Sequence, residues 1–556
     1  VLGYLFTLFF AAYAAERGWI PRHIVRHPLV YVFSLGVYAS AWAFYGSVGL
    51  ANQYGYGYLA YYLGISGAFV MSPILLRPLL HITRIYQLSS LADLLAFRYR
   101  SRLAGMLVAL FTLAVVVPML TLQITAITDS LQLLNSDWPD SALAFGFCVL
   151  MIIFAVLFGA RHVSPREKHE GLVFALAFES LLKLTVILVL GGVALFGVFG
   201  ELGGLEQWLT EHHDQLTEQQ MTLQEGPWRT LLLVFFAAAI VMPHMFHVIL
   251  TENINSDALK PASWGFPLFL LAMSMAVPPI LWAGVHLQVD TPPEYYALGI
   301  GLALESPALT LMTFVGGLAA ASGVMIVITL ASAAMVLNHL VLPVHKPSPR
   351  HDFYRWLLWM RRSLIAGILL LSYAFYLMVG ADLDLARLGI LAFVAALQFL
   401  PGVLGLLYWP KSNRKGFLAG LLSGIVIWVY GMLLPFSETA LGWSVPLPML
   451  PVDEANWHLA ALASFGVNLA LFVLVSATSK QKASEISAAQ ACSIDTVSRP
   501  SRRPLVAANS NDVITALSKP LGRYVAEREV YQALHDLDLP SYEDRPYALR
   551  RLRAKL

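Results

Sequence analysis

Residues 231–252 read LLLVFFAAAIVMPHMFHVILTE, and this stretch sets Pro243, His244 and His247 inside a segment apolar enough to lie in a lipid bilayer. Because proline lacks a backbone N–H and collides with the preceding turn, we expect the helix to kink or unwind there. Carbonyl groups freed by such a break cannot face lipid, so they must line a cavity or meet neighbouring protein. Secondary transporters use broken helices of this kind as binding sites. A kinked packing helix with two buried histidines is an equally open alternative.

The whole chain has the composition of an integral membrane protein. Of its 556 residues, 58% are hydrophobic and 13% are charged, and the mean hydropathy is +0.66. Apolar runs of roughly 20 residues recur, and each is long enough to cross a bilayer as a helix. We therefore expect an all-α integral membrane protein with about thirteen transmembrane helices. Their approximate limits are 1–14, 28–50, 57–80, 103–134, 141–160, 170–199, 229–251, 264–288, 308–342, 356–379, 384–408, 415–435 and 457–477.

The charge of the connectors predicts the orientation in the membrane. Connectors after odd-numbered spans carry arginine and lysine, whereas those after even-numbered spans are acidic. Since basic loops stay in the cytoplasm, we expect the N-terminus outside and the C-terminus inside. The chain opens at Val1 within an apolar run, which we interpret as an uncleaved first span. The net charge of +2 says nothing about partners, and we expect no nucleic-acid partner.

Residues 1–477 hold the predicted membrane domain, and the character of the chain changes after it. Residues 478–508 are rich in Ser, Ala, Arg and Pro, as in a linker. Residues 509–556 show helical periodicity and predict a small cytosolic helical segment with a break at Pro520 and Gly522. The final YALRRLRAKL is a basic helix without a capping signal, so we expect this segment to be incomplete.

The second predicted span combines small and aromatic residues. Residues 31–49 read YVFSLGVYASAWAFYGSVG, with Tyr38, Trp42 and Tyr45 at spacings i, i+4 and i+7. The small residues of this span, such as Gly36 and Ser40, let backbones approach closely. The aromatic stripe can stack on a substrate. An aromatic face at the membrane interface is the alternative.

Two further spans carry polar groups at apolar depth. Glu179 and Lys183 lie at i, i+4 on one helix face, where they form either a structural ion pair or a proton relay. The span 308–342 contains Ser322, Thr329 and Ser332, whose hydroxyls suit Na⁺ when they meet carbonyls from a broken neighbouring helix. These hydroxyls can equally bond to the carbonyl one turn earlier.

Sequence motifs of nucleotide and metal enzymes are absent. The chain has no P-loop, no dinucleotide-binding glycine motif and no HExxH motif. We therefore expect no catalytic residues, no cofactor and no metal beyond a degenerate Na⁺ site, and transport would be secondary. His244 and His247 titrate near neutral pH in their ordinary state, so either could couple to a proton or bind a carboxylate.

Residues 1–477 resemble the sodium/solute symporter family. The motifs that carry the resemblance are SSLADLLAFRYRS (89–101), SAWAFYGSVG (40–49), VMPHMFHVILTEN (241–253) and LAAASGVMIVITLASAAMVLNH (318–339). Within that family, the chain is most similar to the membrane domains of bacterial sensor kinases of the CbrA type, through AFESLLKL (177–184) and FHVILTENI (246–254). Residues 512–539 resemble the first part of the helical STAC domain that joins such transporters to their kinases.

The resemblance implies the LeuT-type fold, with two inverted five-helix repeats at about 28–199 and 229–408 whose first helices are both broken. The family's sodium ligands are backbone carbonyls of the first core helix and hydroxyls of the eighth. They correspond here to Gly36 and Ala39, and to Ala319, Ser322 and Gly323. Gly323 stands where the family has a second hydroxyl. Tyr38 stands where some symporters carry a carboxylate, so proton coupling or uncoupled sensing is favoured slightly over Na⁺ coupling.

The resemblance also implies a function. We expect a domain of a bacterial inner-membrane protein that binds and transports a small solute and is the sensory input of a two-component histidine kinase, whose kinase domains or response regulator it meets through the cytosolic tail. The solute is an amino acid, with histidine favoured over acetate, proline or another small carboxylate. A non-transporting receptor and a free-standing symporter are the alternatives, and homodimerisation stays open. The candidate substrate-binding residues are Tyr38, Ser40, Trp42, Tyr45, Pro243, His244, Phe246 and His247. The candidates for ion or proton coupling are Gly36, Ala39, Ala319, Ser322, Gly323, Glu179 and Lys183.

Overall fold

A computed structural model describes residues 1–135, 137–159, 169–212, 225–253, 255–345, 353–379, 383–436, 456–492 and 507–556. Every regular element within these ranges is helical. The chain divides into two compact units, a membrane unit (Val1–Val497) and a tail unit (Ser498–Leu556).

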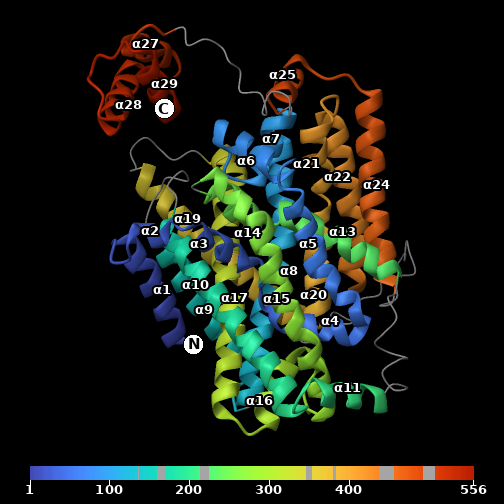
Figure 1. Ribbon diagram of the computed structural model, residues 1–556. Helices are drawn as coiled ribbons and strands as arrows, with labels where there is room; N and C mark the ends of the chain where they lie inside the picture. Colours follow the sequence, from blue (N-terminus) through green and yellow to red (C-terminus); the bar gives the residue numbers. More distant parts are fainter. Residues whose placement is uncertain are drawn as a thin grey trace. The chain divides into compact units, whose positions relative to one another are not determined.

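The membrane unit is built from α-helices with short 3-10 and π-helical segments (η) (Figure 1). Its first elements are α1 (Leu2–Glu16), α2 (Arg22–Val25), α3 (Pro28–Ser34), η1 (Leu35–Tyr38), η2 (Trp42–Gly46), α4 (Ser47–Tyr54), η3 (Gly55–Leu59), α5 (Ala60–Val70), α6 (Leu76–Ile85), α7 (Leu91–Tyr99), α8 (Arg102–Leu134), α9 (Asp140–Gly159), α10 (Glu170–Gly192), η4 (Val193–Val198) and α11 (Leu202–Glu211). The remaining elements are α13 (Glu225–Val241), α14 (Pro243–Phe246), η5 (His247–Thr251), η6 (Ser256–Ala258), α15 (Leu259–His286), η7 (Pro293–Tyr295), α16 (Tyr296–Ala303), α17 (Pro307–Val336), η8 (Leu337–Val341), α18 (Leu342–Val344), α19 (Phe353–Val379), α20 (Leu385–Leu397), α21 (Leu400–Tyr408), α22 (Arg414–Trp428), η9 (Val429–Leu433), α24 (Trp457–Thr478) and α25 (Ala483–Cys492).

The described residues contain nine helices long and apolar enough to cross a membrane, or up to eleven if each of two bent helix pairs is one span. The shorter apolar helix α1 adds to these. The expected count of thirteen is not confirmed. One reason is that the separately predicted spans 28–50 and 57–80 are arranged as Pro28–Tyr38 followed, after a bend, by Trp42–Val70. An apolar window measures composition and cannot see such a bend.

The two bent pairs are the stretches that the sequence analysis singled out. Pro28–Tyr38 and Trp42–Val70 meet at 75°, and Gly226–Val241 and Pro243–Thr251 meet at 44°. At the second bend, Met242 is extended (φ −67°, ψ 133°) and Pro243 begins the next helix at its first position, where a missing N–H costs nothing. The predicted break at Pro243 is therefore confirmed.

The core of the membrane unit is formed by its most buried spans. In the apolar windows of Pro307–Val344 and Leu385–Tyr408, 89% and 94% of residues are buried. Helix α17 contacts α8 and α10, and α8 contacts α20 (Figure 1). Helices α6, α7 and α25 lie at one end of the unit, which we call the α7 end, and α11 and α16 lie at the other.

The tail unit is a small helical bundle of α27 (Ser510–Leu521), α28 (Arg523–Asp536) and α29 (Pro546–Lys555). Asn509 caps α27 by accepting a hydrogen bond from the N–H of Asp512 at 3.0 Å, and Gly522, with φ +80°, ends it. Its core residues include Ile514, Val530, Leu534, Leu549 and Leu552.

The stretch that we expected to be a linker, 478–508, contains an ordered helix. Residues Ala483–Cys492 form α25, and Ala488, Ala489 and Cys492 are buried against the membrane unit. The composition of this segment gave no sign of the helix, because alanine and serine are common both in short packed helices and in linkers. Residues 493–506 of the predicted linker lie outside the described residues.

Candidate functional site

The first break leaves backbone groups that are met by side chains from other helices. The N–H of Ala41 donates to Oε1 of Gln123 at 3.0 Å, and the hydroxyl of Tyr61 donates to the carbonyl of Tyr38 at 2.9 Å. The N–H of Trp42 donates to the hydroxyl of Ser40 at 3.2 Å. Ser40 thus accepts from the restarting helix as a cap does. The freed backbone groups of the unwound residues are therefore bonded to side chains of α5 and α8.

An aromatic cluster with one histidine connects the two breaks. Tyr38 stacks on Tyr61 with ring centroids 4.7 Å apart, and Trp42 lies against Tyr61 at 4.8 Å. The ring of His244 lies 6.4 Å from that of Tyr38. All four side chains are at most 1% exposed. The hydroxyl of Tyr38, Nε1 of Trp42 and both ring nitrogens of His244 have no hydrogen-bond partner among the described residues.

Unpartnered buried polar atoms are costly, and native proteins keep few of them without a reason. The hydroxyl of Tyr38 and the ring nitrogens of His244 lie between the two broken membrane helices and are donors or acceptors that a solute could use, whereas Nε1 of Trp42 lies on the side of the cluster that packs against Gly389 of α20. Tyr38, Trp42 and His244 therefore form the part of the predicted substrate set that the structure brings together, which we call the break cluster.

The other predicted substrate residues lie in two different surroundings. Tyr45 packs against the ring of Tyr295 at 5.4 Å and lies against Gly317 of α17. Pro243, Phe246 and His247 line a small cavity, together with Ser89 and Ser90. This cavity leads from the second break toward the start of α7.

The residues predicted for ion or proton coupling are all buried where η1, α10 and α17 contact one another. Nζ of Lys183 lies 3.1 Å from Oε1 of Glu179, and both side chains are 0% exposed. A Cβ atom on Gly323 would overlap Oε2 of Glu179. Helix α10 also packs closely against the first break, since a Cβ on Gly36 would lie 2.5 Å from Oγ of Ser180. Ala39, directly after η1, and Ala319 and Ser322, on α17, are each completely buried nearby.

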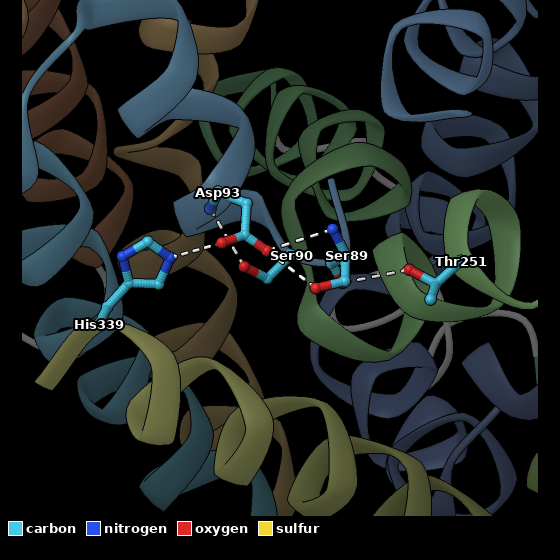
Figure 2. A network of polar contacts seen from close by, with 5 residues as sticks. All are labelled: Ser89, Ser90, Asp93, Thr251 and His339. Atoms are coloured by element: carbon cyan, nitrogen blue, oxygen red, sulfur yellow. Dashed lines mark hydrogen bonds and ion pairs between the residues drawn. The ribbon is translucent and has the colours of Figure 1, made fainter. Parts of the chain in front are cut away.

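A network of polar contacts at the α7 end joins three parts of the fold (Figure 2). Nε2 of His339, on η8, lies 2.7 Å from Oδ1 of Asp93. The N–H and hydroxyl of Ser89 donate to Oδ2 of Asp93, and the hydroxyl of Thr251, on η5, donates to the carbonyl of Ser89. Ser90 caps α7 by accepting from the N–H of Asp93. Burial would raise the pKa of Asp93, but the contacts with His339 and the two serines outweigh it and hold that pKa below its usual value.

A second carboxylate, that of Glu252, lies at the α7 end. Glu252, 2% exposed, accepts from the N–H and Nδ1 of His169 at 2.8 and 2.9 Å and pairs with Nε2 of His247 at 3.0 Å. Burial alone would raise the pKa of Glu252, yet the two histidines hold it well below its usual value. Burial would lower the pKa of His169, but Glu252 raises it above its usual value. His247 is therefore engaged with Glu252 at the edge of the cavity.

Several of these residues were missed by sequence reasoning. Gln123 is an amide inside a 33-residue apolar helix, and this isolated polar group was the available signal. Tyr61 and Glu252 carried none, because a tyrosine near a membrane interface and a carboxylate at the end of a span are both ordinary. His339 was quoted within a motif, but its partner Asp93 is 246 residues away in the chain.

Two broken spans that meet at a buried polar cluster, inside a bundle of long apolar helices, define a membrane protein with the LeuT-type transporter fold. Among solved structures, the chain is similar to a substrate-bound, outward-open Na⁺-coupled sialic acid symporter, with a TM-score of 0.60 and 12% identity over 87% of this chain and 98% of that one. This likeness shows the fold.

The comparisons with known sequences give two relatives. The chain is 24% identical over 462 residues to a monocarboxylic acid transporter of Corynebacterium glutamicum, covering 78% of this chain and 80% of the relative. It is 20% identical over 404 residues to the uncharacterized symporter YodF of Bacillus subtilis, covering 71% and 75%. No family model matches the chain.

Proposed function

We propose that the chain is a secondary carrier for a small solute that bears a carboxylate, and that the solute binds at the break cluster. The observation that carries this proposal is the set of unpartnered polar atoms on Tyr38, Trp42 and His244, buried where two broken membrane helices meet. The small cavity lined by Pro243, Phe246 and His247 lies beside the second break, toward the start of α7, and we take it as one part of a route toward the α7 end. The names of both relatives, a transporter and a symporter, agree with the proposal.

The chemistry of the break cluster suits a carboxylate next to an apolar or planar group. The hydroxyl of Tyr38 and an imidazole N–H of His244 are donors, and a carboxylate accepts such bonds strongly; the indole N–H of Trp42 would join them once the ring moves off Gly389. The rings of Tyr38, Trp42 and Tyr61 offer flat faces. Histidine, proposed from the sequence resemblance, has both features. Acetate or another small monocarboxylate is the second candidate, favoured by the name of the Corynebacterium relative.

Uptake by purified protein in liposomes tests this proposal. We expect labelled histidine or labelled acetate to accumulate inside, with the unlabelled form of the true solute competing and the other failing to compete. Binding of a solute without accumulation would support a non-transporting receptor instead. Neither binding nor uptake of any small carboxylate or amino acid would overturn the proposal.

We further propose that solute occupancy is reported to the tail unit through α7. The α7 end is assigned to the cytoplasm in this proposal, since its connectors are the basic ones. On one side, Asp93 contacts His339, which follows α17, and the carbonyl of Ser89 accepts from Thr251, which follows the second break. On the other side, Arg98, 0% exposed, lies within hydrogen-bond distance of the carbonyls of Pro410 and Ser412 at 3.1 and 3.2 Å.

The loop that contains Pro410 and Ser412 also contacts the segment that leads to the tail unit. Gln481 donates to the carbonyls of Pro410 and Ser412, each at 2.8 Å, and Glu485 accepts from the N–H of Arg414 at 2.9 Å. Helix α25 then packs on α7 and α21 and ends at Cys492, just before the tail unit begins at Ser498. A shift of α7 during gating would therefore move α25, and kinase domains or a response regulator bound to the tail would receive the change.

Cys492 offers a direct readout of this movement. Its side chain is 0% exposed, so a maleimide should label it slowly while α25 is docked. We expect the transported solute to increase the labelling rate severalfold, because rearrangement of α7 loosens α25. The variant Cys492→Ser keeps Cys148, the other cysteine of the chain, and should give a low rate with and without solute. An unchanged rate in a sample that demonstrably binds solute would contradict the proposed route.

A further inference from the structure

The sequence resemblance implies a sodium site, so the residues present can be compared with the ligands that such a site needs. Such a site offers neutral ligands, carbonyls of the first core helix and hydroxyls of α17, so that the ion brings an uncompensated positive charge. Here Ser322 is the hydroxyl that remains, and its Oγ has no hydrogen-bond partner among the described residues. The neighbouring position is Gly323, which offers no side-chain oxygen.

The space beside Gly323 is filled from another helix. Oε2 of Glu179, on α10, lies where a Cβ of residue 323 would be. A serine or threonine at this position would collide with the carboxylate, so glycine and glutamate are complementary. Glu179 has only one hydrogen bond among the described residues, the one to Lys183 through Oε1, and Oε2 has none.

Lys183 already balances this carboxylate. Its Nζ lies 3.1 Å from Oε1, and neither side chain reaches solvent. Tyr4 of α1 is within electrostatic range of Glu179 and also lies by Ser322, and His244 of α14 is within electrostatic range of Lys183. A Na⁺ ion entering here would add a second positive charge against one carboxylate at apolar depth, which is strongly unfavourable.

We infer that the ammonium group of Lys183 stands in for the coupling cation, so that this carrier works without Na⁺. The inference rests on the proposed carrier function for its consequence in transport, but its structural content concerns Na⁺ binding alone. It also assigns Glu179 as the group that holds this internal cation next to α17. Because α10 packs against η1, which carries Tyr38, the internal cation lies on a helix that borders the break cluster, where its charge favours an anionic solute.

Thermal unfolding of the purified protein in NaCl and in choline chloride at equal ionic strength tests Na⁺ binding without any solute. We expect equal melting temperatures for the wild type and for Ser322→Ala. Lys183→Met leaves the Glu179 carboxylate unbalanced, so its melting temperature should be lower and should rise specifically in NaCl. The matched control Glu179→Gln/Lys183→Met removes both charges and should show no Na⁺ effect.

A Na⁺-specific rise in the wild type that Ser322→Ala abolishes would overturn the inference, and this comparison stands even if Lys183→Met fails to fold. Uptake then gives the second arm. Wild-type accumulation should be the same with and without Na⁺, and a strict Na⁺ requirement would also overturn the inference. Absence of uptake in every ion would count against the proposed function, whereas the unfolding experiment would still decide whether Na⁺ binds.

Discussion

Replacing His244 with leucine should weaken solute binding by roughly 10- to 100-fold. An imidazole N–H that donates to a carboxylate contributes about 1.5–3 kcal/mol, and each 1.4 kcal/mol is about tenfold in affinity. The same change should leave the solute-free protein as stable or slightly more stable, because both ring nitrogens of His244 are buried without partners. Calorimetric titration and thermal unfolding of the same samples measure the two effects.

The opposite signs of these two effects separate a binding role from a structural one. If His244 only packs the core, leucine should change stability and leave affinity alone, and that outcome would remove the residue from the site. His286→Leu is a suitable control, since His286 lies at the end of α15 against Phe199 and Trp208. This control should leave affinity unchanged.

Asp93→Asn should destabilise the α7 end by about 1.5–3 kcal/mol, the usual value of a hydrogen bond to a charged group. Asparagine keeps the shape of the side chain but removes the charge that faces His339. Because the pKa of Asp93 is lowered in the folded protein, its contribution is present above the ordinary aspartate value and is lost as the pH falls through the lowered one. The difference from the wild type should therefore shrink only at acidic pH.

Loss of this contact should also open the cavity behind it. A cysteine introduced at Ala331, which lines the cavity, should be labelled faster in Asp93→Asn than in its parent, both in a Cys148→Ser/Cys492→Ser background. Ser90→Ala removes only the cap of α7, costs about 1 kcal/mol and should change labelling less. Equal labelling of the parent and the Asp93→Asn protein would show that this network does not close the cavity.

The fold could be predicted from the sequence to the level of its class. The composition requires membrane helices, and Pro243 requires a break, because both follow from local chemistry. The local sequence determines the first break less strongly, since Gly36 and Ala39 permit unwinding without forcing it. It depends on Gln123 and Tyr61, which meet the freed backbone from helices far away in the sequence. The number of spans was not confirmed, because an apolar window does not reveal where a bent helix pair forms one span.

The candidate site could be predicted residue by residue only where the breaks determine it. Tyr38, Trp42 and His244 come together because they flank the two breaks. Tyr45 and His247 have similar chemistry, but their contacts with Tyr295 and Glu252 draw them to other surroundings. The pairing of Glu179 with Lys183 follows from helical spacing, whereas the position of Glu179 beside Gly323 depends on how α10 packs against α17.

The proposed carrier function requires that two interrupted helices leave a solute site between Tyr38, Trp42 and His244. An experimental structure of the protein in a lipid nanodisc with its solute bound would show whether they do. We expect solute density between residues 38–42 and residues 242–244, with both helices interrupted there. Continuous helices with packed side chains at this depth, or solute bound elsewhere, would contradict it.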